Sequence, residues 1–173
     1  WAPDVGSEGK VGLKRYVDVK EAIGDLPKVE PGKDASTEAF NYPCNNEFLR
    51  RIGRRGVYPL YDHIARKHNE LDRERFRQMI SHHWSFGQLR REMPQYEHER
   101  VRLFDNSYVV QWWDLPSKTI LAHIYKDGFQ FIHPDEKQAR TFTVREAARI
   151  QSFPDDFVFK GSRGEKYKQI GNA

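Results

Sequence analysis

The sequence contains a single cysteine, Cys44, among its 173 residues. No disulfide can form within the chain, which excludes the disulfide framework of small secreted proteins and favours a reducing, cytoplasmic location. The sequence also lacks a run of about 18 apolar residues, the length needed for a membrane-spanning helix. We therefore expect no membrane association, and no signal peptide is recognised.

Ligand spacings typical of metal sites are missing as well. The seven histidines are scattered, and no cysteine or carboxylate set joins them at the spacing of a zinc site, so no metal is expected. The sequence shows no β-α-β alternation and no glycine-rich loop after a strand. It has no internal repeat.

The distribution of basic residues along the sequence has two interpretations. The 29 basic residues exceed the 25 acidic ones by four, and arginines cluster at positions 50–55 and again at 73–91. The planar guanidinium suits phosphate, but a run of charges is more often a solvated surface. Aromatic residues make up 13% of the chain, and filling a core is a commoner use for them than stacking on bases.

Capping signals and apolar periodicity predict several helices in the first hundred residues. Asp18 and Glu21 form a capping box for a helix that Pro27 ends. Asn69 is the expected N-cap of a helix over 70–81. Shorter helices are predicted over 47–52, 60–68 and 86–92, and residues 28–37 are expected to be a linker.

The pattern changes after residue 100. Residues 108–113 favour a strand, and residues 118–132 favour a hairpin that turns at Lys126-Asp127-Gly128. Thr143 and Glu146 form a capping box for a helix with Val144, Ala147, Ala148 and Ile150 buried. The predicted fold class is α+β, with a helical N-terminal half followed by a small antiparallel sheet or hairpin and a helix.

Two late segments point to a family. Residues 140–157 (RTFTVREAARIQSFPDDF) closely resemble the ninth conserved motif of the DNA (cytosine-5) methyltransferases, and residues 167–173 (YKQIGNA) resemble the run into the tenth motif. Residues 18–27 are similar to the segment after the eighth motif. Residues 113–123, with Ser-Lys-Thr-Ile in the middle, resemble the part of the target-recognition domain in which a Thr precedes an aliphatic residue.

The resemblance implies a division of the chain and an activity. Residues 1–37 would be an arm after the catalytic domain, 38–139 the target-recognition domain, and 140–173 the part that docks back onto the catalytic domain. The family flips a cytosine out of duplex DNA and methylates its carbon 5 with S-adenosylmethionine. The implied partners are double-stranded DNA and that catalytic domain. An apolar docking face would favour self-association.

The resemblance does not supply a nucleophile. The family's catalytic Cys lies in a Pro-Cys pair usually followed by Gln, whereas Asn45 follows Cys44, and Cys44 comes after the eighth-motif region rather than before it. An ordinary thiol is the better interpretation, and no catalytic residue is assigned. Only Gly171 and Asn172 of the tenth motif are left to line a cofactor pocket, so the chain alone is not expected to bind S-adenosylmethionine.

Residue roles are implied only in part. Lys118, Thr119 and Arg140 are the predicted DNA contacts, although Thr119 fits a plain strand position equally well. For Thr143, Arg145, Glu146, Arg149 and Gln151, holding the recognition domain in place is favoured over contacting DNA. The bases that would be read are not evident from the sequence.

The chain begins at Trp1 and ends at Ala173, within a motif, and we expect an inactive recognition fragment of a bacterial-type enzyme. The alternatives are a non-enzymatic DNA-binding module or one subunit of a split methyltransferase. A basic α+β protein that binds DNA or RNA without modifying it would leave the late motifs unexplained.

Overall fold

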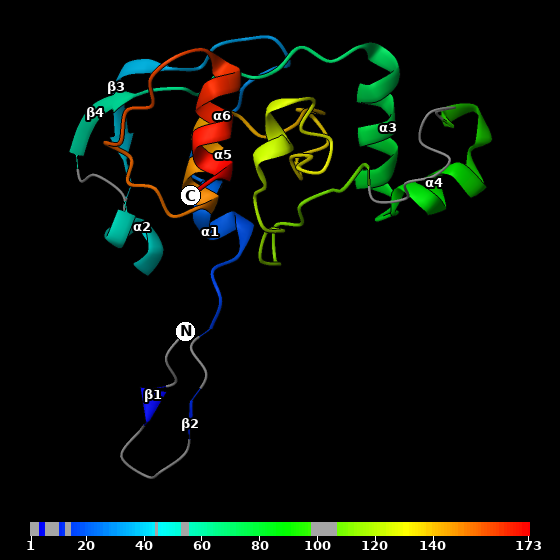
Figure 1. The fold of residues 1–173 in the computed structure, drawn as a ribbon. Helices are drawn as coiled ribbons and strands as arrows, with labels where there is room; N and C mark the ends of the chain where they lie inside the picture. The colour runs from blue at the N-terminus through cyan, green and yellow to red at the C-terminus, as the bar shows by residue number, and fades with distance from the viewer. Residues whose placement is uncertain (1–3, 6–10, 13–14, 44, 53–55, 98–106) are drawn as a thin grey trace.

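A computed structural model describes residues 4–5, 11–12, 15–43, 45–52, 56–97 and 107–173. The arrangement is α+β, with one antiparallel pair of strands on the helical body and a second pair in an arm that leaves it (Figure 1). The elements in chain order are β1 (Asp4–Val5), β2 (Val11–Gly12), α1 (Val19–Ile23), β3 (Thr37–Tyr42), α2 (Glu47–Ile52), β4 (Gly56–Leu60), α3 (Glu70–Ser81), α4 (Phe86–Glu92), the 3-10 turns η1 (Pro94–Tyr96) and η3 (Ala122–Tyr125), α5 (Val144–Ile150) and α6 (Arg163–Gly171).

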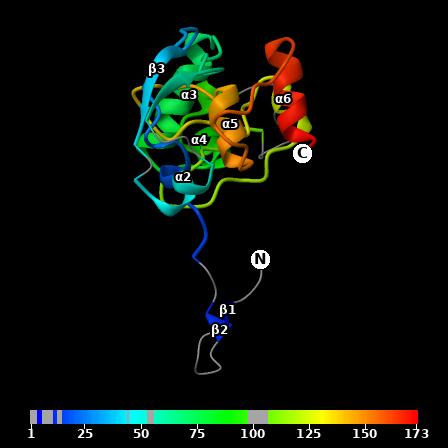
Figure 2. The same ribbon diagram turned by 90° about the vertical axis from the view of Figure 1, so that its left-hand side faces the viewer.

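The strands lie in the first part of the chain. β1 pairs with β2 in an arm that projects from the body (Figures 1 and 2), and β3 pairs with β4 in an antiparallel register that joins Phe40 to Tyr58. The helix predicted over 60–68 is therefore wrong, because Leu60 ends β4 and Ile64 bridges to Asp34. The first half of the chain is not only helical.

The hairpin predicted over 118–132 is also wrong. Residues 122–125 form the 3-10 turn η3, and the expected strand over 108–113 is reduced to a parallel bridge between Val110 and Ile132. A distant side chain explains the difference. The Arg66 guanidinium donates hydrogen bonds to the carbonyls of Ile124 and Lys126, so tertiary contacts override the local preference for strand.

The capping signals succeed where the hairpin signal fails. The structure confirms the capping boxes at Asp18 and Thr143, and the Asn69 side chain accepts from the Asp72 amide at the start of α3. Helices α2 and α4 have the predicted bounds. Helix α6 was not predicted, although Ser162 and Glu165 form a capping box at its start.

Two clusters of buried side chains form the core. The first joins α1, α5 and α6 to the β3–β4 pair, and the second joins α3 and α4 to the segments around Tyr108 and Ile132. Figures 1 and 2 show α5 and α6 in one part of the molecule and α3 and α4 in another. Consecutive residues connect the clusters, since Phe131 belongs to the first and Ile132 to the second.

In the part of the chain that the structure describes, no helix is long and apolar enough to cross a membrane. The same residues contain no group of three or more His, Cys, Asp or Glu side chains that could hold a metal ion.

Candidate nucleic-acid interface

A cleft of about 610 Å³ opens between α1, α2 and the end of α5. Four stretches far apart in the sequence line it, so it exists only in the folded chain. Its lining residues are 15–18, Ala22, Phe48, Arg51, 116–120 and 150–152.

Lys118 and Thr119 lie on this cleft with exposed side chains. The buried Gln111 side chain holds their loop, because its Oε1 accepts from the Lys118 amide at 2.8 Å and from Ser117 Oγ at 3.0 Å. The next residue, Ile120, is buried in the first core cluster. A fixed backbone thus carries an exposed cation and a hydroxyl, both of which can contact a phosphate.

The cleft also receives residues from other elements. Gln151 follows α5, and its amide Nε2 donates to the carbonyl of Ile170 at 3.2 Å. Arg15 and Arg51 are exposed cations on the cleft; Arg51 belongs to the arginine cluster at 50–55, and Arg15 was not singled out from the sequence. Each is also paired with a neighbouring carboxylate, Arg15 with Asp18 and Arg51 with Glu47, and no local pattern indicated that the two arginines would meet.

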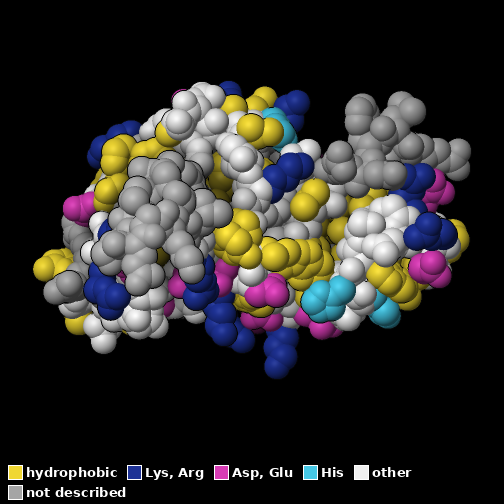
Figure 3. All heavy atoms as spheres, turned by 90° about the horizontal axis from the view of Figure 1, so that it is seen from below, with side chains coloured by type: hydrophobic (Ala, Val, Ile, Leu, Met, Phe, Trp, Pro, Cys, Tyr) yellow, Lys and Arg dark blue, Asp and Glu magenta, His cyan; other side chains and the backbone are white. Residues whose placement is uncertain are grey.

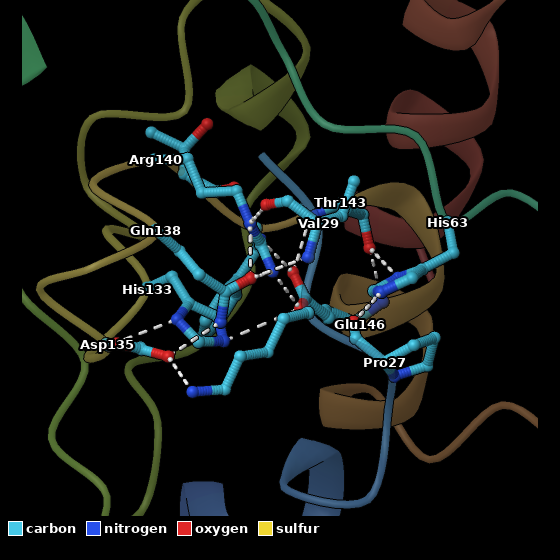
Figure 4. Close-up of polar contacts among 12 residues, drawn as sticks. Pro27, Val29, His63, His133, Asp135, Gln138, Arg140, Thr143 and Glu146 are labelled. Atoms are coloured by element: carbon cyan, nitrogen blue, oxygen red, sulfur yellow. Dashed lines mark hydrogen bonds and ion pairs between the residues drawn. The ribbon is translucent and has the colours of Figure 1, made fainter. Parts of the chain in front are cut away.

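Arg140, in contrast, lies away from any surface. Its side chain is 0% exposed, and its two terminal nitrogens donate to the two carboxylate oxygens of Glu146 at 2.7 and 2.8 Å (Figure 4). Its Nε and Nη2 also donate to Gln138 Oε1, and its Nε donates to the Val29 carbonyl. In this structure no donor of Arg140 is available to a DNA phosphate, contrary to the role predicted from the sequence.

Glu146, the acidic member of this pair, is also buried. Despite the cost of burial, the charge of Arg140 and its hydrogen bonds hold the pKa of the Glu146 carboxyl well below its usual range. The same carboxylate accepts from the Thr143 amide at 2.7 Å, which closes the capping box of α5. Glu146 is therefore both an ion-pair partner and part of the helix cap.

Two histidines surround the ion pair in uncharged form. Burial lowers the pKa of His133 to about 3, although Glu146 lies 3.6 Å from its Nε2. Burial also lowers the pKa of His63, whose Nε2 contacts the Pro27 carbonyl and whose Nδ1 contacts Thr143 Oγ1 (Figure 4). A carbonyl can only accept, so the proton of His63 lies on Nε2 and the Thr143 hydroxyl donates to Nδ1.

Arg145 and Arg149 on α5 are equally buried. Arg145 donates to the backbone carbonyls of Tyr61, Pro154 and Phe157, and burial lowers the pKa of its guanidinium. Arg149 makes two hydrogen bonds to Asp155, at 2.8 and 3.0 Å, and a further ion pair with Asp25. The contacts with Tyr61 and Asp25 join α5 to segments 84 and 124 positions away in the chain.

Asn172 does not lie in a site that fits S-adenosylmethionine. It caps α6 and lines an open, polar surface with Lys160, Gly161, Glu165, Lys168 and Gln169, none of which offers an aromatic wall for an adenine. The preceding Gly171 faces the protein, since a Cβ there would meet the backbone of Leu121 and Ala122 at about 2.6 Å. Cys44, Arg54, Arg55 and Arg100 lie outside the described residues.

Comparison with known proteins gives consistent matches. A family model described as C-5 cytosine-specific DNA methylase matches residues 16–173. The type II methyltransferase M.Bpa9945I of Bacillus paralicheniformis is 36% identical over 95% of this chain and 39% of its own length. M.DdeI of Desulfomicrobium norvegicum is 30% identical over 95% of the chain and 41% of its own length.

A plant protein matches the same region. DNA (cytosine-5)-methyltransferase 4 of Arabidopsis thaliana is 32% identical over 98% of the chain and 12% of its own length. The chain thus spans about two fifths of the two bacterial relatives and a smaller share of the plant relative.

Proposed function

The chain belongs to the C-5 cytosine-specific DNA methylase family, and from that membership we propose that these residues recognise the duplex DNA target of a cytosine-5 methyltransferase. The observation that carries the proposal is the cleft in which Lys118, Thr119 and Gln151 meet Arg15 and Arg51. Lys118 and Thr119 come from the segment that resembles the target-recognition domain, and Gln151 comes from the ninth motif. All three line the cleft beside the two arginines. Such a surface suits a phosphate backbone.

The proposal gives each part of the chain a task. Residues 38–139 form the target-recognition domain, and residues 140–173 carry the ninth motif and the start of the tenth. The buried charges in and before α5 support this task from inside: Arg149 bonds to the carbonyl of Ala22 on the cleft, and Arg140 and Arg145 hold α5 against the segments around Val29 and Tyr61. We assign Arg140 this positioning role in place of DNA contact.

For the parent activity, we propose methylation of carbon 5 of cytosine with S-adenosylmethionine, and we propose that this chain alone is inactive. The chain offers neither the nucleophile motif nor a fitting cofactor site around Asn172. A methyl-transfer assay tests this with the chain alone and with a polypeptide that supplies Pro-Cys-Gln and Glu-Asn-Val segments. Transfer by the chain alone would contradict it, as would micromolar S-adenosylmethionine binding in calorimetry.

DNA binding is tested through its salt dependence. The affinity of the chain for duplex DNA should fall steeply with salt, and Lys118→Ala should reduce the slope of log K against log salt by about 1. Lys137→Ala is the matched control, since Lys137 is exposed but does not line the cleft. An affinity for duplex DNA that does not change with salt would contradict the proposed contacts with phosphate.

Thr119 needs its own test, because a β-branched side chain also suits extended backbone. Thr119→Val keeps the shape and removes the hydroxyl, so a loss of DNA affinity of about threefold to tenfold would reflect a lost hydrogen bond. Unchanged affinity would leave Thr119 as a backbone-shaping residue.

A further inference from the structure

Two adjacent histidines at the end of α3 are each stacked on a tryptophan. The His82 ring lies 4.2 Å from the Trp84 ring at an angle of 20°, and the His83 ring lies 4.5 Å from the Trp112 ring at 16°. Both histidines are exposed, and both tryptophans are half-buried against the second core cluster. The proposed DNA cleft does not include them.

The backbone at His83 makes the pair unusual. Trp84 N donates to the Met79 carbonyl at 2.9 Å and His83 N to the Ile80 carbonyl at 3.3 Å, which is the Schellman motif that ends a helix. This motif places its C′ residue in the left-handed region, where glycine is preferred, and His83 has a φ of 54°. The chain therefore keeps an imidazole where its own backbone favours glycine, and such strain is often found at functional positions.

The stacked pair is joined to the cleft by one loop. Trp112 follows Gln111, the residue whose side chain also holds Ser117 and the Lys118 amide. In Figure 1 the end of α3 and this loop lie on the lower side of the body, above the arm, and Figure 3 shows histidine side chains beside hydrophobic ones on that side. Residues 111–118 therefore carry both the stacking partner of His83 and the exposed cation of the cleft.

The chemistry of the stacks fits the edges of bases. Stacking fixes each imidazole, so little conformational entropy is lost when a ring nitrogen makes a hydrogen bond. Within the described residues, the structure gives the His83 ring nitrogens no hydrogen-bond partner, whereas Nδ1 of His82 lies 3.0 Å from Ser81 Oγ and 3.1 Å from the Gln78 carbonyl, so the contact of His82 with a base would use Nε2.

We propose that His82 and His83 contact base edges in the groove of the duplex and help to set which sequence this chain prefers. The inference rests on the proposed function, because it needs DNA in the neighbouring cleft. Trp84 and Trp112 act as positioning residues that hold the two imidazoles.

The test uses His83→Gly in the 173-residue chain, with a pool of random-sequence duplexes that is sequenced after binding. Glycine fits the left-handed backbone, so the variant should unfold at the same temperature as the parent chain or a higher one. Its preference at one or two base-pair positions should weaken by about threefold to tenfold, the value of one hydrogen bond.

Ala139→Gly is the control, because Ala139 also has a positive φ, of 41°, but is fully buried. Its sequence preference should match that of the parent chain. If His83→Gly keeps the parent preference, the inference is overturned while the proposed function stands. If His83→Gly weakens binding to all sequences equally and lowers the salt slope, the contact is to phosphate and base reading is overturned. If the parent chain selects no duplex, the proposed function fails and this inference with it.

Discussion

Arginine has different surroundings in the region around α5 and on the outer face of helix α3, whose inner face carries the buried Arg75 paired with Asp72. Arg140, Arg145 and Arg149 are 0% exposed, and carboxylates or backbone carbonyls occupy their donors. On α3, Arg73 and Arg77 lie near the surface and pair with glutamates that are 69% exposed or 31% exposed. A run of arginines in a sequence thus does not distinguish charges that hold a chain together from charges at the surface.

The largest expected effect comes from removing one partner of a buried pair. Glu146→Gln leaves the Arg140 guanidinium buried without a counter-charge, and we expect a loss of about 3–5 kcal/mol in the free energy of unfolding. Chemical denaturation measures it. A loss in the free energy of unfolding below about 1 kcal/mol would show that the buried pair stabilises the chain no more than the exposed pairs of α3 do.

The second largest effect is expected at Gly171, which packs closely against the backbone of Ala122. Gly171→Ala puts a methyl group about 2.6 Å from the backbone of Ala122, and we expect a loss of about 3 kcal/mol because neither backbone can move freely. Gly164→Ala, on the same helix with nothing near its Cβ, is the control. It should stabilise the chain slightly through helix propensity. Equal behaviour of the two variants would refute the close contact.

Acid should weaken the α5 region through its buried histidine. The folded pKa of His133 is about 3, below the unfolded value of 6.5, so in this interval the unfolded chain binds a proton that the folded chain does not. The stability that His133 contributes is therefore complete above pH 6.5 and is lost as the pH falls. We expect a loss of about 2 kcal/mol from this residue between pH 7 and pH 5. Denaturation curves for His133→Gln should show a shallower dependence on pH, and an unchanged slope would contradict the assignment.

The smallest effect belongs to α3. Glu70→Ala removes the partner of Arg73 and Arg77 at an exposed site, where solvent screens the charges. We expect no resolvable change in the denaturation midpoint. A shift as large as that of Glu146→Gln would show that the exposed pairs of α3 matter as much as the buried pair.

What the sequence could reveal depended on distance along the chain. Capping boxes join residues three positions apart, and those at Asp18 and Thr143 were predicted correctly. The turn η3 depends on Arg66, which is 58 positions away from Ile124, and the sequence predicted a hairpin there. No local pattern reveals such a partner.

The candidate site follows the same rule. The motifs placed Lys118 and Thr119 among the DNA contacts, and both line the cleft together with Gln151, for which a role in holding the recognition domain in place was favoured. They did not reveal Arg15 or Arg51, which reach the cleft only through the packing of α1 and α2. They also assigned Arg140 to DNA, because an arginine before a helix looks the same whether it faces a phosphate or a buried glutamate.

The buried contacts of α5 also have a consequence for the order in which the chain folds. Arg149 bonds to the Ala22 carbonyl 127 positions earlier, and Arg140 to the Val29 carbonyl 111 positions earlier, whereas α3 and α4 are neighbours in the sequence. Contacts that close long loops form slowly, since the entropy of closure must be overcome before they stabilise anything. During synthesis, α1 cannot make its contact with Arg149 until that residue has left the ribosome. We therefore expect the α5 region to fold last.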